Sequence, residues 1–214
     1  MLEQMKVAIF DMDGTLIDSM SEWRRLNIAF VRGRGIDLTP EQEKALYSMT
    51  GRVVVDYVRD HFGIQADFQE LLDIASARIE TAYRNGLPLK PGALAYLRRL
   101  RARGVQCVVC TATPSRPALI ALNRSGLVPE LDAIITTEMI GGHKGDPDFF
   151  DRLCAFLGSD KAGCVMFEDA LYAMCGAREA GLGVVGITDS TNEPDRARIF
   201  EVCDRVIDSY DELP

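Results

Sequence analysis

The chain has 214 residues, of which 47% are hydrophobic, and its formal net charge is −8 at pH 7. This length and apolar fraction suit a globular protein with one full domain and a smaller insert. The negative charge and the lack of a Lys/Arg run argue against binding to a phosphate backbone, so we expect no nucleic-acid partner.

The apolar segments and the cysteines of the chain allow an expectation about its cellular compartment. The first ten residues lack the apolar stretch of a signal peptide, and no later segment reaches the roughly 20 apolar residues of a membrane span. We therefore expect a cytoplasmic protein with no membrane partner. The six cysteines lie mostly inside apolar runs, which predicts reduced, buried thiols. Cys107 and Cys110 spell C-x-x-C, but on a strand they would face opposite sides and could not share one metal.

Short apolar runs alternate with helical patterns along most of the chain. This alternation predicts an α/β fold, a doubly wound parallel sheet with helices on both faces. The runs occupy residues 7–10, 105–110, 133–135, 164–167, 184–187 and 206–207.

Two acids, Asp11 and Asp13, stand just after the first run, and Gly14 and Thr15 follow them. Open α/β sheets bind their ligands at the carboxyl ends of the strands, so we expect a site here. Two acids one residue apart repel each other unless a cation joins them, and a glycine lets the backbone turn sharply. A hard cation such as Mg²⁺ is the simplest partner. Taken alone, the segment could also be an ordinary Asp-Gly turn with both acids in water.

Residues 18–89 interrupt the alternation, because helical stretches follow one another there without an intervening strand. This predicts an inserted helical cap domain between two parts of the α/β core, residues 1–17 and 90–214. Two helix starts carry capping signals: Thr39 followed by Pro40 and Gln42, and Asp67 followed by Glu70.

The chain returns to the core with a predicted helix over residues 92–103. Gly104 follows it at the position where glycine commonly terminates a helix. The next strand runs into Thr111. Thr113 and Pro114 then predict the N-cap and the first position of another helix.

The sequence Phe10-Asp11-Met12-Asp13-Gly14-Thr15 after an apolar strand resembles the first motif of the haloacid dehalogenase-like superfamily. Three later segments resemble the other motifs of that family in the right order: Thr111 at a strand end, Lys144 in Lys144-Gly145-Asp146-Pro147-Asp148, and the pair Glu168-Asp169 after the fourth strand. Gly145 departs from the pattern, because a second proline is more usual there.

The resemblance implies a Mg²⁺-dependent phosphatase that acts on a small phosphorylated metabolite, such as a sugar phosphate. Asp11 would be the nucleophile, transiently phosphorylated, and a metal ligand. Asp13 would offer its backbone carbonyl to the metal, protonate the leaving alcohol and later activate water. Glu168 and Asp169 would complete the metal site, Asp169 directly and Glu168 directly or through water.

Phosphate binding is implied for a second set of residues. Lys144 would neutralise the phosphoryl oxygens, and Thr111 with the N–H of Ala112 would hold them. Gly14 and Thr15 are assigned to the same phosphate-binding group.

The insert resembles the helical cap of the β-phosphoglucomutase-like branch, a lid that selects the substrate. Thr50-Gly51-Arg52 resembles its cap loop, so Arg52 would reach a second anionic group or, equally, be a surface arginine. Trp23 stands twelve residues after Asp11, where β-phosphoglucomutases carry a histidine, and we read it as a core or cap-facing aromatic.

Two other functions stay open. The absent histidine favours a phosphatase over a phosphosugar mutase, in which the phosphoryl group would pass to a second sugar. A non-catalytic binding protein on the same fold would not need both acids of the first motif together with Thr111, Lys144 and the second acidic pair. We expect a monomer or a weak homodimer.

Overall fold

The computed structural model describes residues 1–49 and 51–214, and for Ser48, Gly51, Arg52 and Leu72 it describes the backbone alone.

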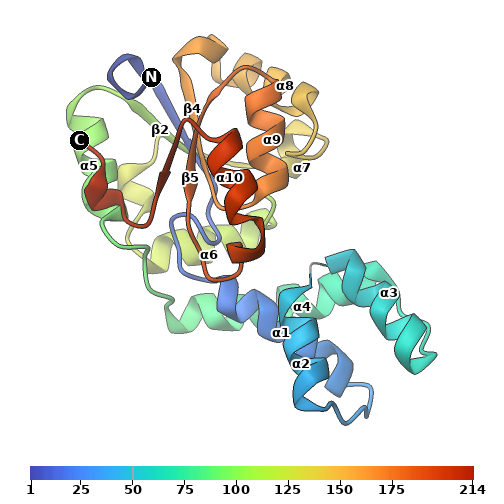
Figure 1. Ribbon diagram of the computed structural model, residues 1–214. Helices are drawn as coiled ribbons and strands as arrows, with labels where there is room; N and C mark the ends of the chain where they lie inside the picture. Colours follow the sequence, from blue (N-terminus) through green and yellow to red (C-terminus); the bar gives the residue numbers. More distant parts are fainter. Residues whose placement is uncertain (50) are drawn as a thin grey trace.

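A parallel sheet forms the centre of the molecule (Figure 1). Within the described residues it has six strands in the order β3-β2-β1-β4-β5-β6. The strands are β1 (Val7–Phe10), β2 (Gln106–Thr111), β3 (Ala133–Thr136), β4 (Cys164–Glu168), β5 (Gly183–Ile187) and β6 (Arg205–Ile207). The predicted doubly wound α/β fold is confirmed, and the predicted strand ends are correct to within one or two residues.

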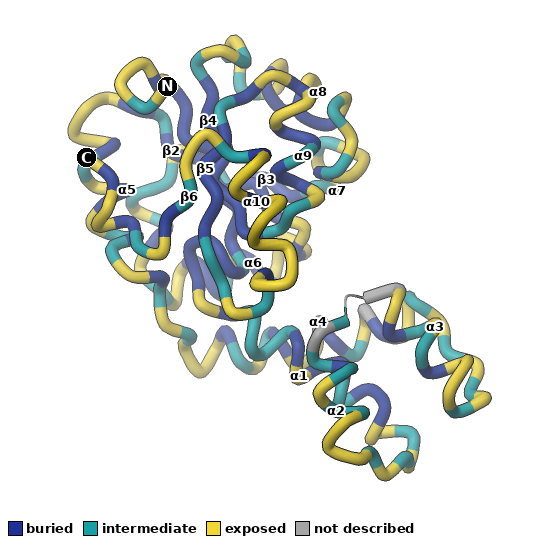
Figure 2. Tube along the Cα trace, viewed as in Figure 1, coloured by how far each residue is buried: buried dark blue, intermediate teal, exposed yellow. Residues whose placement is uncertain are grey.

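Helices cover both faces of the sheet, and the central strands β1, β2 and β4 are buried between them (Figure 2). One apolar cluster joins a sheet face to α5 (Ala93–Ala102) and α6 (Ser115–Arg124). A second cluster joins the other face to α8, α9 and α10. The helices near this second face are α7 (Thr137–Ile140), α8 (Pro147–Leu157), α9 (Leu171–Glu179) and α10 (Arg196–Val202). Cys107 belongs to the first cluster and Cys110 to the second, which confirms that they face opposite sides, and both are free thiols.

The strand order reverses at β1, because the chain builds outward from it first on one side and later on the other. Phe10 is level with Val109 of β2 and with Phe167 of β4. The residues that follow these three positions therefore meet at one edge of the sheet. This is the switch point at which open α/β folds bind ligands.

Among the described residues between β1 and α5, four helices form a second lobe beside this edge (Figure 1). They are α1 (Met20–Arg32), α2 (Pro40–Ser48), α3 (Gly51–Phe62) and α4 (Phe68–Asn85). The lobe has its own apolar cluster, with Phe30, Leu46 and Val58 at its centre. Its presence agrees with the predicted helical insert, while the boundaries at residues 17/18 and 89/90 stay a prediction.

The two connecting segments between the lobe and the sheet run side by side. The N–H of Asp18 donates to the carbonyl of Pro88 (2.9 Å), and that of Lys90 donates to the carbonyl of Leu16 (2.9 Å). Ile17 and Leu89 also form an antiparallel bridge. The chain therefore enters and leaves the lobe through two adjacent segments that are hydrogen-bonded to each other.

The local helix signals are mostly confirmed. Thr39 makes a capping box with Gln42, and Asp67 accepts a hydrogen bond from the N–H of Gln69. Gly104 lies just beyond α5 at φ +77°. The predicted N-cap role of Thr113 is wrong: α6 begins at Ser115, and the Thr113 hydroxyl is used elsewhere, as a donor to Asp13.

No helix among the described residues is long and apolar enough to cross a membrane.

Candidate active site

Three carboxylates meet at the switch point of the sheet. Asp11 follows β1, Glu168 ends β4 and Asp169 follows it, and one oxygen of each lies within 4.8 Å of the others. The N–H of Asp11 donates to the carbonyl of Phe167 at 2.9 Å, which places Asp11 level with Glu168. All three side chains are buried. The parallel register of β1 and β4 is therefore what brings the two acidic motifs together.

Lys144 is the cation of this cluster. Its ammonium group, 2% exposed, donates to Oδ1 of Asp11 and to Oε2 of Glu168, the latter at 3.1 Å. The lysine comes from the loop between α7 and α8, and its carbonyl oxygen lies against Gly176 of α9. A Cβ on Gly176 would approach that oxygen to 2.2 Å, so the loop can sit this close only over a glycine. This close contact with α9 fixes the loop in a position from which Lys144 reaches Asp11 and Glu168.

The charges in the cluster do not balance. Burial raises the pKa of Asp11 and that of Asp169, and the neighbouring carboxylates raise both further, although Lys144 opposes this at Asp11. Burial would lower the pKa of Lys144, but the carboxylates of Asp11 and Glu168 outweigh it and raise that pKa, so the lysine stays an ammonium. If all three carboxylates are ionised, one ammonium leaves two negative charges uncompensated in a buried site.

These residues fit a divalent cation. Their donors are all carboxylate oxygens, which hard cations such as Mg²⁺ and Ca²⁺ prefer, and a charge of +2 would balance the excess. Sequence reasoning named Asp11, Glu168 and Asp169 for such a site, and the structure brings these three together.

The turn after β1 packs against Asp169. Gly14 has φ +80°, and a Cβ there would come within 2.3 Å of Oδ2 of Asp169. The Thr15 hydroxyl, fully buried, donates to Oδ1 of the same carboxylate at 3.1 Å. The glycine is therefore required for both its backbone angle and its lack of a side chain, as the sequence indicated for the angle.

The carboxylate of Asp13 faces three hydroxyl groups. Its Oδ1 accepts from Ser19 and from Tyr83, each at 2.5 Å, and its Oδ2 accepts from Thr113 at 2.7 Å. Sequence reasoning missed Ser19 and Tyr83. Ser19 lies close to the motif in sequence, but Tyr83 is 70 residues away on α4, and no local pattern connects it with Asp13.

Thr111 lies where the sequence predicted, at the end of β2, and it is buried. Its hydroxyl oxygen accepts from the N–H of Thr113 at 3.0 Å. Ala112 follows in an exposed turn. Arg52 is the second residue of α3, but its side chain and the whole of Thr50 lie outside the described residues, so the predicted cap loop is not described.

The loop after β5 supplies further contacts that sequence reasoning missed. Asn192 donates its amide to the carbonyls of Asp169 (2.9 Å) and Ile187 (3.0 Å). Asp189 accepts from Lys90 at 2.5 Å, which connects this loop to the segment through which the chain returns from the helical lobe to the core. Asp189 and Asn192 follow a strand that ends at the same edge of the sheet, and this position is the feature of the sequence that could have indicated them.

Trp23 packs partly buried against the apolar cluster that includes Tyr83, in agreement with a core aromatic. Its indole nitrogen is buried and has no hydrogen-bond partner among the described residues. The next residue, Arg24, is buried and donates to the carbonyl of Met49 at the end of α2.

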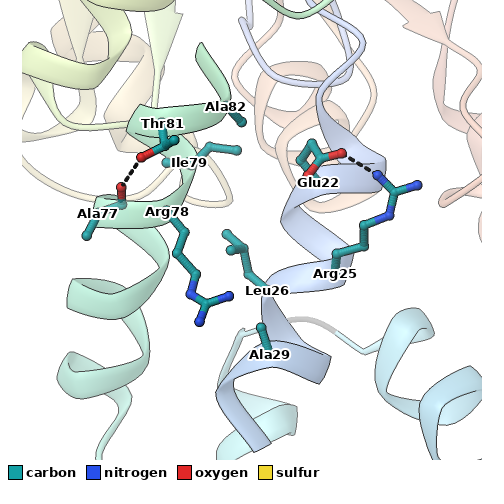
Figure 3. A pocket seen from close by; sticks show the side chains of 9 residues that line it. All are labelled: Glu22, Arg25, Leu26, Ala29, Ala77, Arg78, Ile79, Thr81 and Ala82. Atoms are coloured by element: carbon teal, nitrogen blue, oxygen red, sulfur yellow. Dashed lines mark hydrogen bonds and ion pairs between the residues drawn. The ribbon is translucent and has the colours of Figure 1, made fainter. Parts of the chain in front are cut away.

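A pocket of about 460 Å³ lies between α1 and α4 (Figure 3). Glu22, Arg25 and Leu26 line it on one side, and Arg78 and Ile79 on the other. It shares no residue with the carboxylate cluster. The chemistry that the cluster can perform therefore belongs to the edge of the sheet and not to this pocket.

Comparison with known proteins agrees with this geometry. A family model described as haloacid dehalogenase-like hydrolase matches residues 5–181. The validoxylamine A 7'-phosphate phosphatase of Streptomyces hygroscopicus subsp. limoneus is 31% identical over 86% of this chain and 85% of its own length. Hexitol phosphatase A of Escherichia coli (strain K12) is 28% identical over 96% and 91%. The crystal structure of CbbY from Rhodobacter sphaeroides in complex with phosphate has a TM-score of 0.77 and 22% identity, covering 98% of this chain and 96% of that one.

Proposed function

The chain belongs to the haloacid dehalogenase-like hydrolases, and from this premise we propose that it hydrolyses a small phosphorylated metabolite with Mg²⁺ through a phosphorylated Asp11. The reaction class is phosphoric monoester hydrolysis, in keeping with similar proteins that are phosphatases. The observation that carries the proposal is the buried contact between the Asp11 carboxylate and the Lys144 ammonium at the switch point, beside Glu168 and Asp169.

Asp11, Glu168 and Asp169 would hold the Mg²⁺, with the backbone carbonyl of Asp13 as a further proposed ligand. When bound, the ion would neutralise phosphoryl oxygens that otherwise repel an incoming carboxylate. Lys144 supplies a second positive charge for the same oxygens, because it lies against Asp11 and stays protonated.

In the first step a carboxylate oxygen of Asp11 forms a bond to phosphorus, and the bond between phosphorus and the alcohol oxygen breaks. Asp13 gives its proton to that leaving oxygen. Thr111, the N–H of Ala112 and Lys144 orient the phosphoryl group, with Gly14 and Thr15 in the turn beneath it.

In the second step water attacks the aspartyl phosphate. Asp13, now a carboxylate, takes a proton from this water, so that inorganic phosphate leaves and Asp11 is regenerated. One carboxyl group therefore serves as acid and then as base, which requires that it stay in one place between the steps.

We further propose that residues 18–89 act as a cap domain over residues 1–17 and 90–214, and that the cap selects the substrate. Trp23 in place of a histidine favours transfer of the phosphoryl group to water, and not to a second sugar as in a mutase. The similar hexitol phosphatase makes sugar and polyol phosphates the first compounds to test.

The test is a panel of phosphorylated metabolites incubated with the protein and Mg²⁺, read as release of inorganic phosphate. We expect release from at least one sugar or polyol phosphate, its loss in EDTA and its return with added Mg²⁺. Undiminished release in thoroughly chelated protein would remove the metal from the proposal. Conversion of one sugar phosphate into an isomer without phosphate release would favour the mutase.

A further inference from the structure

We infer that Tyr83 is a positioning residue for the proton-transfer group Asp13, so that the helical lobe contributes directly to the chemical step. This inference rests on the proposed function of Asp13. It concerns a residue outside the four motif segments named above, and it begins from the three hydroxyl groups around the Asp13 carboxylate.

The three donors come from three separate parts of the molecule. Ser19 stands at the start of α1, Tyr83 is in the last turn of α4, and Thr113 lies between β2 and α6. Ser19 and Tyr83 share Oδ1, and Thr113 bonds Oδ2. A carboxyl group has roughly four lone-pair sites, so three are filled and about one is left for the proton that passes to the leaving oxygen or, in the second step, for a donating water. The donors thus fix the rotation of the carboxylate and leave one direction for proton transfer.

The surroundings of the Tyr83 side chain hold its hydroxyl group against Asp13. It is 1% exposed and belongs to the apolar cluster that also contains Ala118 and Leu122 of α6. Burial and the nearby Asp13 carboxylate raise its pKa, so the hydroxyl remains protonated and can only donate to Asp13. An ion pair between Glu80 and Arg116 (3.2 Å) also joins α4 to α6. The phenol can therefore leave Asp13 only if the end of α4 moves relative to the core.

This arrangement explains why a residue of the insert would affect chemistry as well as substrate choice. A proton donor displaced by about 1 Å can cost a reaction on the order of 100-fold. Loss of one of three hydrogen bonds should loosen Asp13 only in part, so a smaller loss than that is expected. Thr113 also donates its N–H to Thr111, which connects the position of Asp13 with a proposed phosphate-binding residue.

The test variant is Tyr83→Phe, which removes the phenol oxygen and keeps the ring. We expect kcat on the best sugar or polyol phosphate of the panel to fall roughly tenfold with KM nearly unchanged, because general acid catalysis is worth ~10²- to 10⁴-fold in total. The burst with p-nitrophenyl phosphate should stay near the wild-type rate, since a nitrophenolate leaves without a proton. The control is Tyr96→Phe, an equally buried core tyrosine, which should change neither rate.

A double-mutant cycle with Asp13→Asn separates positioning from general damage. If Tyr83 acts through Asp13, adding Tyr83→Phe to Asp13→Asn should cause little further loss of kcat, whereas independent effects would multiply. Should Tyr83→Phe fail to fold, Thr113→Val takes its place in the cycle, because its hydroxyl meets the other oxygen of the same carboxylate.

The outcomes distinguish this inference from the function on which it rests. An Asp13→Asn variant with wild-type kcat would overturn both. A slow Asp13→Asn variant combined with an unimpaired Tyr83→Phe variant, with equal losses on both substrates, or with effects that multiply in the cycle, would overturn the role of Tyr83 alone.

Discussion

The carboxylate of Asp11 contacts the ammonium of Lys144, and its pKa is raised because burial, Glu168 and Asp13 disfavour its charged form. We predict that Asp11→Asn abolishes phosphate release and leaves the fold intact, because the amide has the same shape but cannot form the acyl phosphate. Circular dichroism and thermal unfolding check the fold. Asp151→Asn, an exposed carboxylate on the same lobe as the sheet, is the control and should retain full activity. Near-wild-type turnover of Asp11→Asn would withdraw the nucleophile assignment.

Asp13 is assigned to proton transfer, so its loss should harm poor leaving groups more than good ones. Asp13→Asn should lower the burst rate on a sugar phosphate by ~10²- to 10⁴-fold and that on p-nitrophenyl phosphate far less. The burst of the first step must be compared, because hydrolysis of the aspartyl phosphate also needs Asp13 as base and the steady-state rate should fall for both. Equal burst losses would mean that Asp13 places the loop or the metal, and does not act as the acid.

Helix α9 and the Lys144 loop approach each other more closely than any side chain would allow. Gly176 is buried at this contact, with the carbonyl of Lys144 only 2.2 Å from where a Cβ would stand. Alanine would improve helix propensity by roughly 1 kcal/mol, but forcing a group into a packed interior costs about 1–3 kcal/mol. Because the clash is with a backbone carbonyl, which cannot rotate away as a side chain could, the cost of the clash should exceed the gain in helix propensity.

We therefore expect Gly176→Ala to lower the free energy of unfolding by about 1 kcal/mol and to reduce kcat, because the loop that holds Lys144 must retreat from Asp11. Urea unfolding and phosphate release measure the two effects. Gly163→Ala is the matched control: its Cβ would meet only the flexible side chain of Lys6 at 3.4 Å, so both quantities should stay unchanged. A fully active and equally stable Gly176→Ala variant would contradict the tight contact.

The buried acids at the edge of the sheet should make the stability of the whole protein depend on pH. Burial, Glu168 and Asp11 raise the pKa of Asp169 in the folded protein above its unfolded value. Such a group stabilises the fold at low pH, where it is protonated, and this contribution is lost as the pH rises through the folded pKa. Metal-free protein should therefore lose stability with rising pH, and a divalent cation should restore it.

The prediction compares wild type with Asp169→Asn in EDTA, by thermal unfolding over a range of pH. The variant should gain stability relative to wild type as the pH rises, because its amide never acquires the charge. Added Mg²⁺ should raise the Tm of wild type and have little effect on the variant. Parallel pH curves for the two proteins would show that Asp169 carries no unfavourable charge in the fold.

Much of this protein could be predicted from short segments of its sequence. The six apolar runs predicted the strands, because a strand buried in a parallel sheet needs a continuous run of apolar side chains. The acids Asp11, Glu168 and Asp169 stand directly after such runs, and the helix signals at Thr39, Asp67 and Gly104 depend on neighbouring residues alone. These features are local, so the sequence contains them.

The tertiary structure decided which of these ends meet. The pairing of β1 with β4 puts Glu168 beside Asp11, and these two strands are more than 150 residues apart in the chain. Thr113 was predicted to cap a helix, but α6 begins at Ser115, and the Thr113 hydroxyl donates to Asp13, which only the fold brings within 2.7 Å. Tyr83 reaches the same carboxylate because α4 packs against α6. Such contacts depend on which distant surfaces bury each other, and no local pattern of residues determines that.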